Sequence, residues 1–360
     1  MSRPIQALID LNALRHNYAV ARRHAGSAQV WAVLKANAYG HGLLRAARAL
    51  ADTADGFALI ELEGAIALRE AGLEQPLLLL EGFYHAAELP LFAQHRLTPV
   101  LHSLHQVKML LASSLPTRLP VYLKLNTGMN RLGLNADELR TAMQALQTAA
   151  QVGPISLMTH FADADCGQDG RGIRSQMSAF DKLRGALELP LSLANSAALL
   201  RYPESLGNWV RAGIMLYGSS PFPELMTAAA LDLRPVMTLK SELIAVRELN
   251  AGERIGYGGL FQATAPMKIG IVACGYADGY PRHAPTGTPI LIAGRLSRTL
   301  GRVSMDKICV DLSEMPAAGI GAPVVLWGEG LSADLVAAAA GTVSYELFCA
   351  LAARVPVIDI

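Results

Sequence analysis

A lysine that ends an apolar run is the first candidate for chemistry in this sequence. Lys35 follows the run 30–34 and precedes the small, glycine-containing stretch 36–42. The run does not alternate with polar residues, which is typical of a strand buried on both faces. Partial burial lowers the pKa of an amine and frees the lone pair that attacks an aldehyde, so Lys35 is a candidate Schiff-base nucleophile. The alternative is an ordinary lysine at a strand end whose ammonium group reaches water.

The residues after Lys35 would leave space for a flat ligand close to the backbone. Ala36, Asn37 and Gly40 are small, and Tyr39 follows one turn after the lysine. Its hydroxyl could donate a hydrogen bond to a phosphate oxygen. Whether Lys35 acts as a Schiff-base nucleophile depends on the elements that position it.

Short apolar runs and helical stretches alternate through the first two thirds of the chain. This order predicts a (β/α)8 barrel over residues 10–234, and therefore an α/β protein. The helical period is clearest at residues 12–25 and 63–71. The predicted strands are residues 30–34, 56–60, 77–80, 98–101, 121–125, 155–159, 191–194 and one within 209–216.

The composition changes near residue 235 to Thr/Val/Ile-rich segments separated by glycine and proline turns. This pattern predicts a second, mostly-β domain made of residues 235–360, with residues 1–9 adding a strand at 5–9. Two helical stretches, 332–340 and 344–353, interrupt it. The predicted strands are residues 238–246, 268–273, 288–292, 307–311 and 324–326.

Polar residues stand just beyond several of the predicted barrel strands. Active sites in such barrels are built at the C-terminal ends of the strands, so these residues should gather with Lys35 on one rim. They are Lys124, Asn126, His160, Asn195, Ser196 and Arg211.

Charge and composition exclude several classes of function. The 360 residues carry a formal net charge of +1 and no long basic run, which argues against nucleic-acid and membrane-surface binding. No apolar stretch reaches the ~18 residues of a spanning helix, and the N-terminus lacks a signal segment. His102 and His105 lack a third ligand, so we expect no metal. The four dispersed cysteines predict reduced thiols. We therefore expect a complete cytoplasmic protein with a small-molecule substrate.

Six motifs in order resemble those of the alanine racemases, which are fold-type-III enzymes that use pyridoxal 5′-phosphate. Any one of the motifs would be weak evidence, but six in order across both domains are specific. One departure is Ala212, at a position commonly occupied by proline. The motifs are residues 33–42, 124–133, 209–218, 256–259, 275–280 and 303–306.

The resemblance implies racemisation of alanine by two bases on opposite faces of the cofactor. Lys35 would serve the D-face, and Tyr257 of a partner subunit would serve the L-face, so that the complete site exists only in a homodimer. His160 and Arg211 would form a hydrogen-bonded chain behind Tyr257. Arg211 would also face the pyridine nitrogen and, because arginine stays protonated, leave that nitrogen unprotonated.

The resemblance also implies which residues bind the cofactor and the substrate. Arg131 would hold the phenolic oxygen and the substrate carboxylate, with the backbone amide of Met305 from the partner. Lys124 would be a carbamylated lysine, with ordinary ion pairing as the alternative. Asp306 would complete the carboxylate environment or cap a turn. The phosphate would be held by Ser196, Gly213, Ile214, Tyr39 and Tyr345, with Asn195 orienting the loop or capping a helix, and the entrance would be narrowed by Tyr276, Arg282 and Arg302.

Two other functions remain open from the sequence. One is an amino-acid decarboxylase, or a racemase of broader range, on the same fold; the other is a non-catalytic protein that binds pyridoxal phosphate. The motif at 256–259 and the second domain, of roughly 125 residues in a chain above single-core size, favour the racemase over both. The reaction would supply D-alanine for peptidoglycan or consume it in catabolism.

Overall fold

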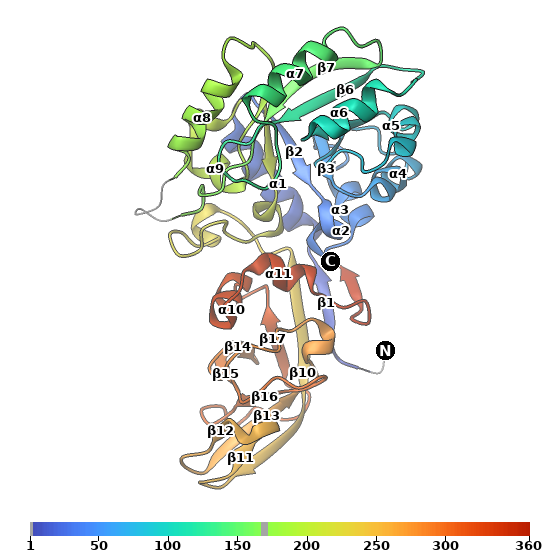
Figure 1. The fold of residues 1–360 in the computed structure, drawn as a ribbon. Coiled ribbons are helices and arrows are strands. Elements are labelled where there is room, and N and C mark those ends of the chain that lie inside the picture. Colours follow the sequence, from blue (N-terminus) through green and yellow to red (C-terminus); the bar gives the residue numbers. More distant parts are fainter. Residues whose placement is uncertain (1–2, 167–171) are drawn as a thin grey trace.

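Eight parallel strands close into a barrel in the computed structural model, which describes residues 3–166 and 172–360 (Figure 1). The barrel closes where the first of these strands pairs with the last, from Gln29 opposite Trp209 to Ala32 opposite Ala212. All eight predicted strands are confirmed. They are β2 (Gln29–Val33), β3 (Gly56–Leu59), β4 (Leu77–Leu79), β5 (Leu97–Leu101), β6 (Leu119–Lys124), β7 (Val152–Met158), β8 (Leu191–Ser192) and β9 (Trp209–Ala212).

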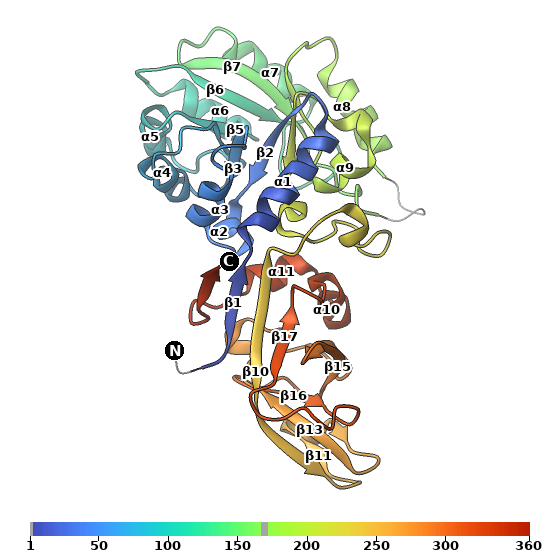
Figure 2. The ribbon, with the colours of Figure 1, turned by 180° about the vertical axis from the view of Figure 1, so that it is seen from behind.

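Helices cover the outside of the barrel (Figures 1 and 2). Local capping explains where two of them begin: Asp10 accepts hydrogen bonds from two amides at the start of α1, and Asn135 forms a capping box with Glu138 at the start of α7. The predicted helices 12–25 and 63–71 are confirmed as α1 and α4. The helices are α1 (Leu11–Ala25), α2 (Lys35–Tyr39), α3 (Leu43–Leu50), α4 (Leu62–Glu70), α5 (Leu89–Gln94), α6 (Leu104–Leu111), α7 (Ala136–Leu146), α8 (Arg174–Arg184) and α9 (Ser196–Arg201).

Aromatic rings form one layer of the barrel interior. The rings of Trp31 and Trp209 stack with centroids 4.0 Å apart, and Tyr122 meets Trp31 edge-on at 6.4 Å. Side chains two residues apart on a strand point to the same face. Lys124 and Arg211, two residues after Tyr122 and Trp209, therefore lie in the next layer toward the C-terminal rim.

The second part of the molecule is a mostly-β domain, and its main sheet lies beside the barrel. Its strand order is β13-β16-β15-β14-β17-β10-β1-β18, and β10 also pairs with β13. The five strands predicted after residue 235 and the N-terminal strand are confirmed, while the boundary between residues 234 and 235 stays a prediction. The strands are β1 (Gln6–Ile9), β10 (Met237–Leu249), β13 (Met267–Val272), β14 (Pro289–Ile292), β15 (Arg295–Leu300), β16 (Ile308–Asp311), β17 (Pro323–Trp327) and β18 (Val357–Asp359), with a small hairpin of β11 (Arg254–Ile255) and β12 (Phe261–Gln262).

Two differences from the predicted second domain have clear physical reasons. β15 was not predicted because its first four residues are polar or solvent-facing, and Ala293 and Gly294, both at positive φ, form its turn with β14. The predicted helix 344–353 ends four residues early, as α11 (Ser344–Cys349). The amide of Ala352 bonds to the carbonyl of Asp278 instead of continuing the helix.

Helix α11 and its neighbour α10 (Ala333–Ala340) lie between the sheet and the barrel (Figure 1). α11 packs closely on the turn after Lys35: a Cβ atom at Gly40 would lie 2.1 Å from the carbonyl oxygen of Phe348. Only glycine fits there, and its φ of +79° also favours glycine. This contact brings Tyr345 of α11 to the barrel rim. None of the helices within 3–166 and 172–360 has the length and apolarity needed to cross a membrane.

Candidate functional site

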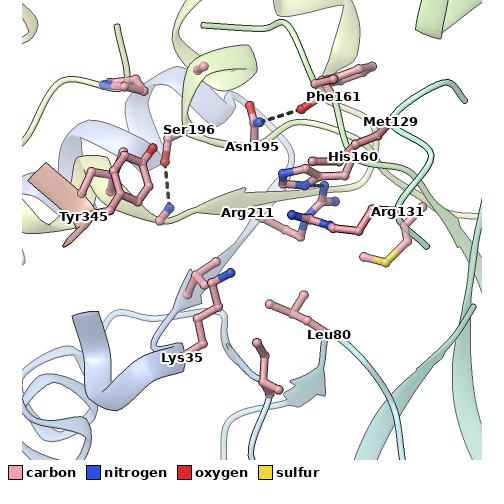
Figure 3. Close-up of a pocket in the computed structure, with 18 of the residues that line it drawn as sticks. Lys35, Leu80, Met129, Arg131, His160, Phe161, Asn195, Ser196, Arg211 and Tyr345 are labelled. Carbon is pink, nitrogen blue, oxygen red and sulfur yellow. Dashed lines mark hydrogen bonds between the residues drawn. The ribbon is translucent and has the colours of Figure 1, made fainter. Parts of the chain in front are cut away.

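A cavity of about 490 Å³ opens at the C-terminal ends of the barrel strands. Figure 3 shows Lys35, Arg131, His160 and Arg211 around its open space, with Asn195, Ser196 and Tyr345 along one side. Eleven of the predicted site residues line this cavity together. They are Lys35, Tyr39, Lys124, Arg131, His160, Asn195, Ser196, Arg211, Gly213, Ile214 and Tyr345.

Lys35 stands at the first position of α2, directly after β2 and Leu34. Burial lowers the pKa of its ammonium group, and the positive charge of Arg131 lowers it further. Both effects favour the neutral amine, which is the nucleophilic form.

The turn after Lys35 is left-handed. Ala36, Asn37, Ala38 and Tyr39 have φ between 52° and 53°, and the amide of Gly40 bonds to the carbonyl of Ala36 at 3.0 Å. This conformation costs roughly 1–2 kcal/mol per residue for L-amino acids, and such strain is found where a functional geometry requires it. Asn37 and Gly40 tolerate positive φ, but the alanines between and before them do not favour it, so the sequence alone does not predict the handedness.

Two side chains hold the left-handed turn in place. Nδ1 of His41 lies 3.1 Å from the carbonyl oxygen of Ala38 and 2.9 Å from that of Tyr39, so Nδ1 carries the proton and donates. Oδ1 of Asn37 accepts a hydrogen bond from the amide of Leu43 at 2.8 Å. The position of Lys35 therefore depends on buried contacts behind the cavity.

Four cationic side chains line the cavity: Lys35, Lys124, Arg131 and Arg211. In the described residues, no carboxylate forms a salt bridge with any of them. Burial, followed by the charges of Arg211 and Arg131, lowers the pKa of Lys124 to about 8. Such a cluster is suited to a ligand that carries several negative charges.

Arg211 is only 5% exposed and is held by backbone oxygens. Its Nη1 donates to the carbonyl and hydroxyl oxygens of Ser192 at 2.7 and 2.8 Å, and its Nη2 donates to the carbonyls of Thr159 and Leu193 at 2.7 and 3.0 Å. Burial lowers its pKa to about 10, which still leaves the guanidinium protonated at neutral pH.

His160 lies beside Arg211 and is neutral. Burial lowers its pKa well below the usual value, and the charge of Arg211 lowers it further. Nη2 of Arg211 lies 3.5 Å from Nδ1 of His160, which accepts this long hydrogen bond because a guanidinium can only donate.

A small cradle of hydroxyl and amide groups lies at the end of β9. The amide of Gly213 donates to Oγ of Ser196 at 2.8 Å, and a Cβ atom at Gly213 would lie 2.8 Å from the hydroxyl oxygen of Tyr39. The rings of Tyr39 and Tyr345 are 5.9 Å apart. Hydroxyl and amide donors of this kind suit a phosphate group. Asn195 caps α9 by accepting from the amide of Ala198 at 3.0 Å.

Apart from Tyr345, the predicted residues of the second domain do not line this cavity of their own chain. Tyr257, 72% exposed, lies in the turn that connects β11 and β12, and Figure 1 shows this hairpin at the end of the molecule away from the barrel. Met305 is 53% exposed. Arg302 lies near this hairpin, since its Nη1 would be 3.6 Å from a Cβ atom at Gly258.

Met305 and Tyr276 belong to two loops that are bound to each other. The amides of Tyr276 and Ala277 donate to the carbonyls of Ser304 and Met305, both at 3.0 Å. The guanidinium of Arg282 lies 5.9 Å from the ring centroid of Tyr276.

A buried carboxylate supports these two loops. Asp278 accepts hydrogen bonds from Arg3 and Arg354, and Arg354 also pairs with Asp306 at 2.6 Å. Asp306 is thus engaged in an ion pair rather than in the cavity.

Sequence reasoning missed several residues near the cavity. Cys349, Glu81 and Thr159 line it. Thr159 also belongs to a buried hydrogen-bonded group with Thr127 and Gln176, which lie behind the cavity. Thr127 lies inside the motif at residues 124–133, so its position in the sequence could have marked it as a residue near the site. Gln176 offered none, because a glutamine in a helix is usually exposed.

Comparison with known protein families gives two matches that together span most of the chain. The model described as alanine racemase, N-terminal domain, matches residues 9–221, and the model described as alanine racemase, C-terminal domain, matches residues 236–359. The two matches follow the order of the barrel and the second sheet.

Curated relatives match the chain over its full length. The alanine racemase of Nitrosomonas eutropha is 53% identical over 362 residues, covering 100% of both chains. The catabolic alanine racemase of Klebsiella aerogenes is 53% identical over 360 residues, again covering 100% of both.

Solved structures share the whole architecture. The biosynthetic alanine racemase from Pseudomonas aeruginosa is 47% identical with a TM-score of 0.97, covering 99% of each chain. The alanine racemase from Bartonella henselae, described with covalently bound pyridoxal phosphate, is 27% identical with a TM-score of 0.89, covering 99% of each chain.

Proposed function

The chain belongs to the alanine racemase family, and from this premise we propose that it interconverts L-alanine and D-alanine with pyridoxal 5′-phosphate bound in the barrel cavity. It is an isomerase of that family. The single observation that carries the proposal is the cavity itself: it is lined by a lysine with a lowered pKa, three further cations, and hydroxyl and amide groups suited to a phosphate.

The residues around the cavity fit each chemical group of this cofactor. Ser196, with the amides at Gly213 and Ile214 and the hydroxyls of Tyr39 and Tyr345, would hold the phosphate. Arg211 would meet the ring nitrogen, and Arg131 the phenolic oxygen. When bound, the cofactor supplies an aldehyde for the amine and withdraws electrons from the substrate's Cα.

Racemisation requires two acid–base groups, because the proton leaves Cα on one face and another returns on the opposite face. Lys35 would take and return the proton on the D-face, and its lowered pKa makes the exchange easier near neutral pH. Tyr257 from a second copy of the chain would act on the L-face. Arg131 would hold the substrate carboxylate, joined by the amide of Met305 from that second copy. Lys124 would orient Arg131 when carbamylated.

Arg211 and His160 would tune this chemistry through hydrogen bonds. A protonated guanidinium offers donors only, so it would keep the ring nitrogen unprotonated. By this contact Arg211 would make the ring a weaker electron acceptor, which would favour return of the proton to Cα over transamination. His160 would connect Arg211 to the incoming Tyr257.

A homodimer would bring the two halves of the site together. Tyr257, Leu260 and Met305 are large, exposed side chains of the second domain, and exposed apolar groups of this kind mark interaction surfaces. Tyr276, Arg282 and Arg302 would narrow the entrance to the partner's cavity, beside Asp306. In this arrangement residues 10–234 form the cofactor domain, and residues 1–9 and 235–360 form the domain that reaches the partner.

The protein would work in the cytoplasm, where it would supply D-alanine for peptidoglycan or consume it. Its relatives include both biosynthetic and catabolic enzymes. A coupled growth test separates these roles: complementation of a strain that requires D-alanine supports supply, and growth on D-alanine as carbon source supports consumption.

A chiral assay of the purified protein with each alanine enantiomer tests the proposed function. We expect both to be converted to the racemic mixture, and the protein to show a visible absorption band from the covalently bound cofactor. Lys35→Ala should remove that band and lower turnover by at least about a hundredfold, whereas Lys108→Ala, an exposed lysine of α6, should change neither. Release of carbon dioxide without racemisation, or a wild-type protein that takes up no cofactor, would refute the proposal.

A further inference from the structure

Three buried polar side chains connect loops on either side of the cavity. Gln176 of α8 is 4% exposed, Thr127 of the loop after β6 is 7% exposed, and Thr159 at the end of β7 is 1% exposed. We propose that these three residues are positioning residues that fix the loop carrying Arg131 against the strand ends carrying His160 and Arg211. This inference rests on the proposed function, in which Arg131 binds the substrate carboxylate.

The loop that carries Arg131 is closed at its base and is bound within itself through Asn126. Residues 125 and 134 form a parallel bridge, and the amide of Asn126 donates to the carbonyl of Leu134 at 3.0 Å. Oδ1 of Asn126 accepts from the amides of Gly128 and Asn130 at 3.1 and 3.0 Å. Arg131 itself is exposed. The direction of the Arg131 side chain therefore depends on the contacts between its loop and the neighbouring elements.

Gln176 holds that loop to the neighbouring one. Its Nε2 donates to Oγ1 of Thr127 at 3.0 Å and to the carbonyl of His160 at 3.1 Å, and its Oε1 accepts from the amide of Ala162 at 2.7 Å. All three bonds leave α8. One side chain thus joins the loop after β6 to the loop after β7.

The hydrogen bonds of the two threonines run in a single direction. Oγ1 of Thr159 donates to the carbonyl of Leu125 at 2.9 Å, which uses its only proton. The 2.8 Å contact between the two hydroxyls must then be a donation from Thr127 to Thr159, and Thr127 accepts from Gln176. Each bond polarises the next, so loss of one hydroxyl weakens all of them.

This series of linked residues ends at the buried guanidinium of Arg211. The carbonyl oxygen of Thr159 accepts from Nη2 of Arg211 at 2.7 Å, and His160 is the next residue. Thr159 also lines the cavity. Movement of the Thr127 loop would therefore change the position of Arg131 relative to Arg211.

Replacement of Thr127 tests the inference on the side of the loop that carries Arg131. Thr127→Val keeps the shape and removes the hydroxyl, Thr127→Ser restores it, and Thr141→Val removes an exposed hydroxyl of α7 as the control. Thr127→Val removes both hydrogen bonds of the hydroxyl, and we expect KM for both alanine enantiomers to rise about fivefold to tenfold, with a smaller change in kcat. Thr127→Ser and Thr141→Val should stay within about twofold of the wild type.

Hydrogen exchange of the holoenzyme gives a second readout that does not depend on activity. Amides of residues 128–133 should exchange faster in Thr127→Val than in the wild type, and amides of α1 should not. If Thr127→Val fails to fold, Gln176→Met removes the bond to Thr127 from the other side, together with the bonds to His160 and Ala162, and should give the same signature. Unchanged KM and unchanged exchange in the variant that folds, or equal effects of Thr127→Ser, would overturn the inference. A wild type without racemase activity would refute the proposed function, and the exchange data would still decide the positioning role.

Discussion

Protonation of His41 should destabilise the folded protein as the pH falls below 6.5. The side chain is fully buried between the rings of Tyr217 and Phe348, with centroids 4.6 and 5.1 Å away. Nδ1 already donates to two carbonyls of the left-handed turn, and Nε2 has no hydrogen-bond partner in the part of the chain that the structure describes. A second proton would sit on Nε2 without an acceptor.

The size of the effect follows from the pKa values. Burial lowers the pKa of His41 from 6.5 to about 4. The unfolded chain therefore binds the proton more readily than the folded one, and this contribution to stability is complete above pH 6.5 and lost as the pH falls to 4. At 1.36 kcal/mol per pKa unit the full difference is about 3 kcal/mol, of which about 2.5 kcal/mol should be lost by pH 4.5.

Urea unfolding at pH 7.5 and 4.5, at one protein concentration, measures this loss. His41→Phe fills the same space without titrating, so its unfolding free energy should fall by about 2.5 kcal/mol less than that of the wild type over this range. His160 and the carboxylates are common to both proteins and cancel in the comparison. At pH 7.5 the variant should be less stable by about 1 kcal/mol or more, because two carbonyls of the turn lose their donor. Equal pH dependence of the two proteins would refute the assignment of a buried, neutral His41.

Three further outcomes test other parts of the structure. Gly40→Ala should lower the melting temperature far more than Gly341→Ala. Both glycines have left-handed φ, but of the two only Gly40 would place a Cβ atom against a backbone carbonyl. Equal losses of melting temperature would contradict the packing of α11 on the turn. Ser196→Ala should weaken cofactor binding to the apoprotein about tenfold in an absorbance titration, as loss of one charge-assisted hydrogen bond implies; unchanged affinity would remove Ser196 from the phosphate cradle. Lys35→Ala and Tyr257→Phe, each inactive alone, should regain about a quarter of wild-type activity when mixed subunits reassociate, because half of the dimers then carry one intact site; no recovery would contradict a shared site.

The barrel was predictable because its strands are apolar on both faces. Runs such as 77–80 contain no polar residue. They are stable only where both faces are buried, one against helices and the other in the barrel interior. β15 has the opposite composition: Arg295, Ser297 and Arg298 are polar and the two arginines are exposed, so nothing in its pattern separates it from a loop. Its identity as a strand comes from pairing with β14 and β16, which single-sequence reasoning does not see.

The candidate site was predictable in its residues and less so in its geometry. Ordered motifs identified Lys35 and Arg211, and the structure brings both to the cavity. The left-handed path of residues 36–39 was not predictable, since alanine prefers the right-handed helix and the surrounding contacts impose the strain. Gln176 was missed for a similar reason, because its burial depends on acceptors supplied by two distant loops.

The chain path makes the two parts of the molecule dependent on each other. β1 lies in the second sheet between β10 and β18, as Figure 2 shows beside β10, and the chain then enters the barrel through α1. The second domain in turn contributes Tyr345 to the cavity and presses Phe348 against Gly40. The strained turn after Lys35 is thus closed from outside by α11, and a barrel cut away from the second domain would lose the support of that turn. The placement of Lys35 is therefore a property of the whole chain, although the residue itself belongs to the barrel.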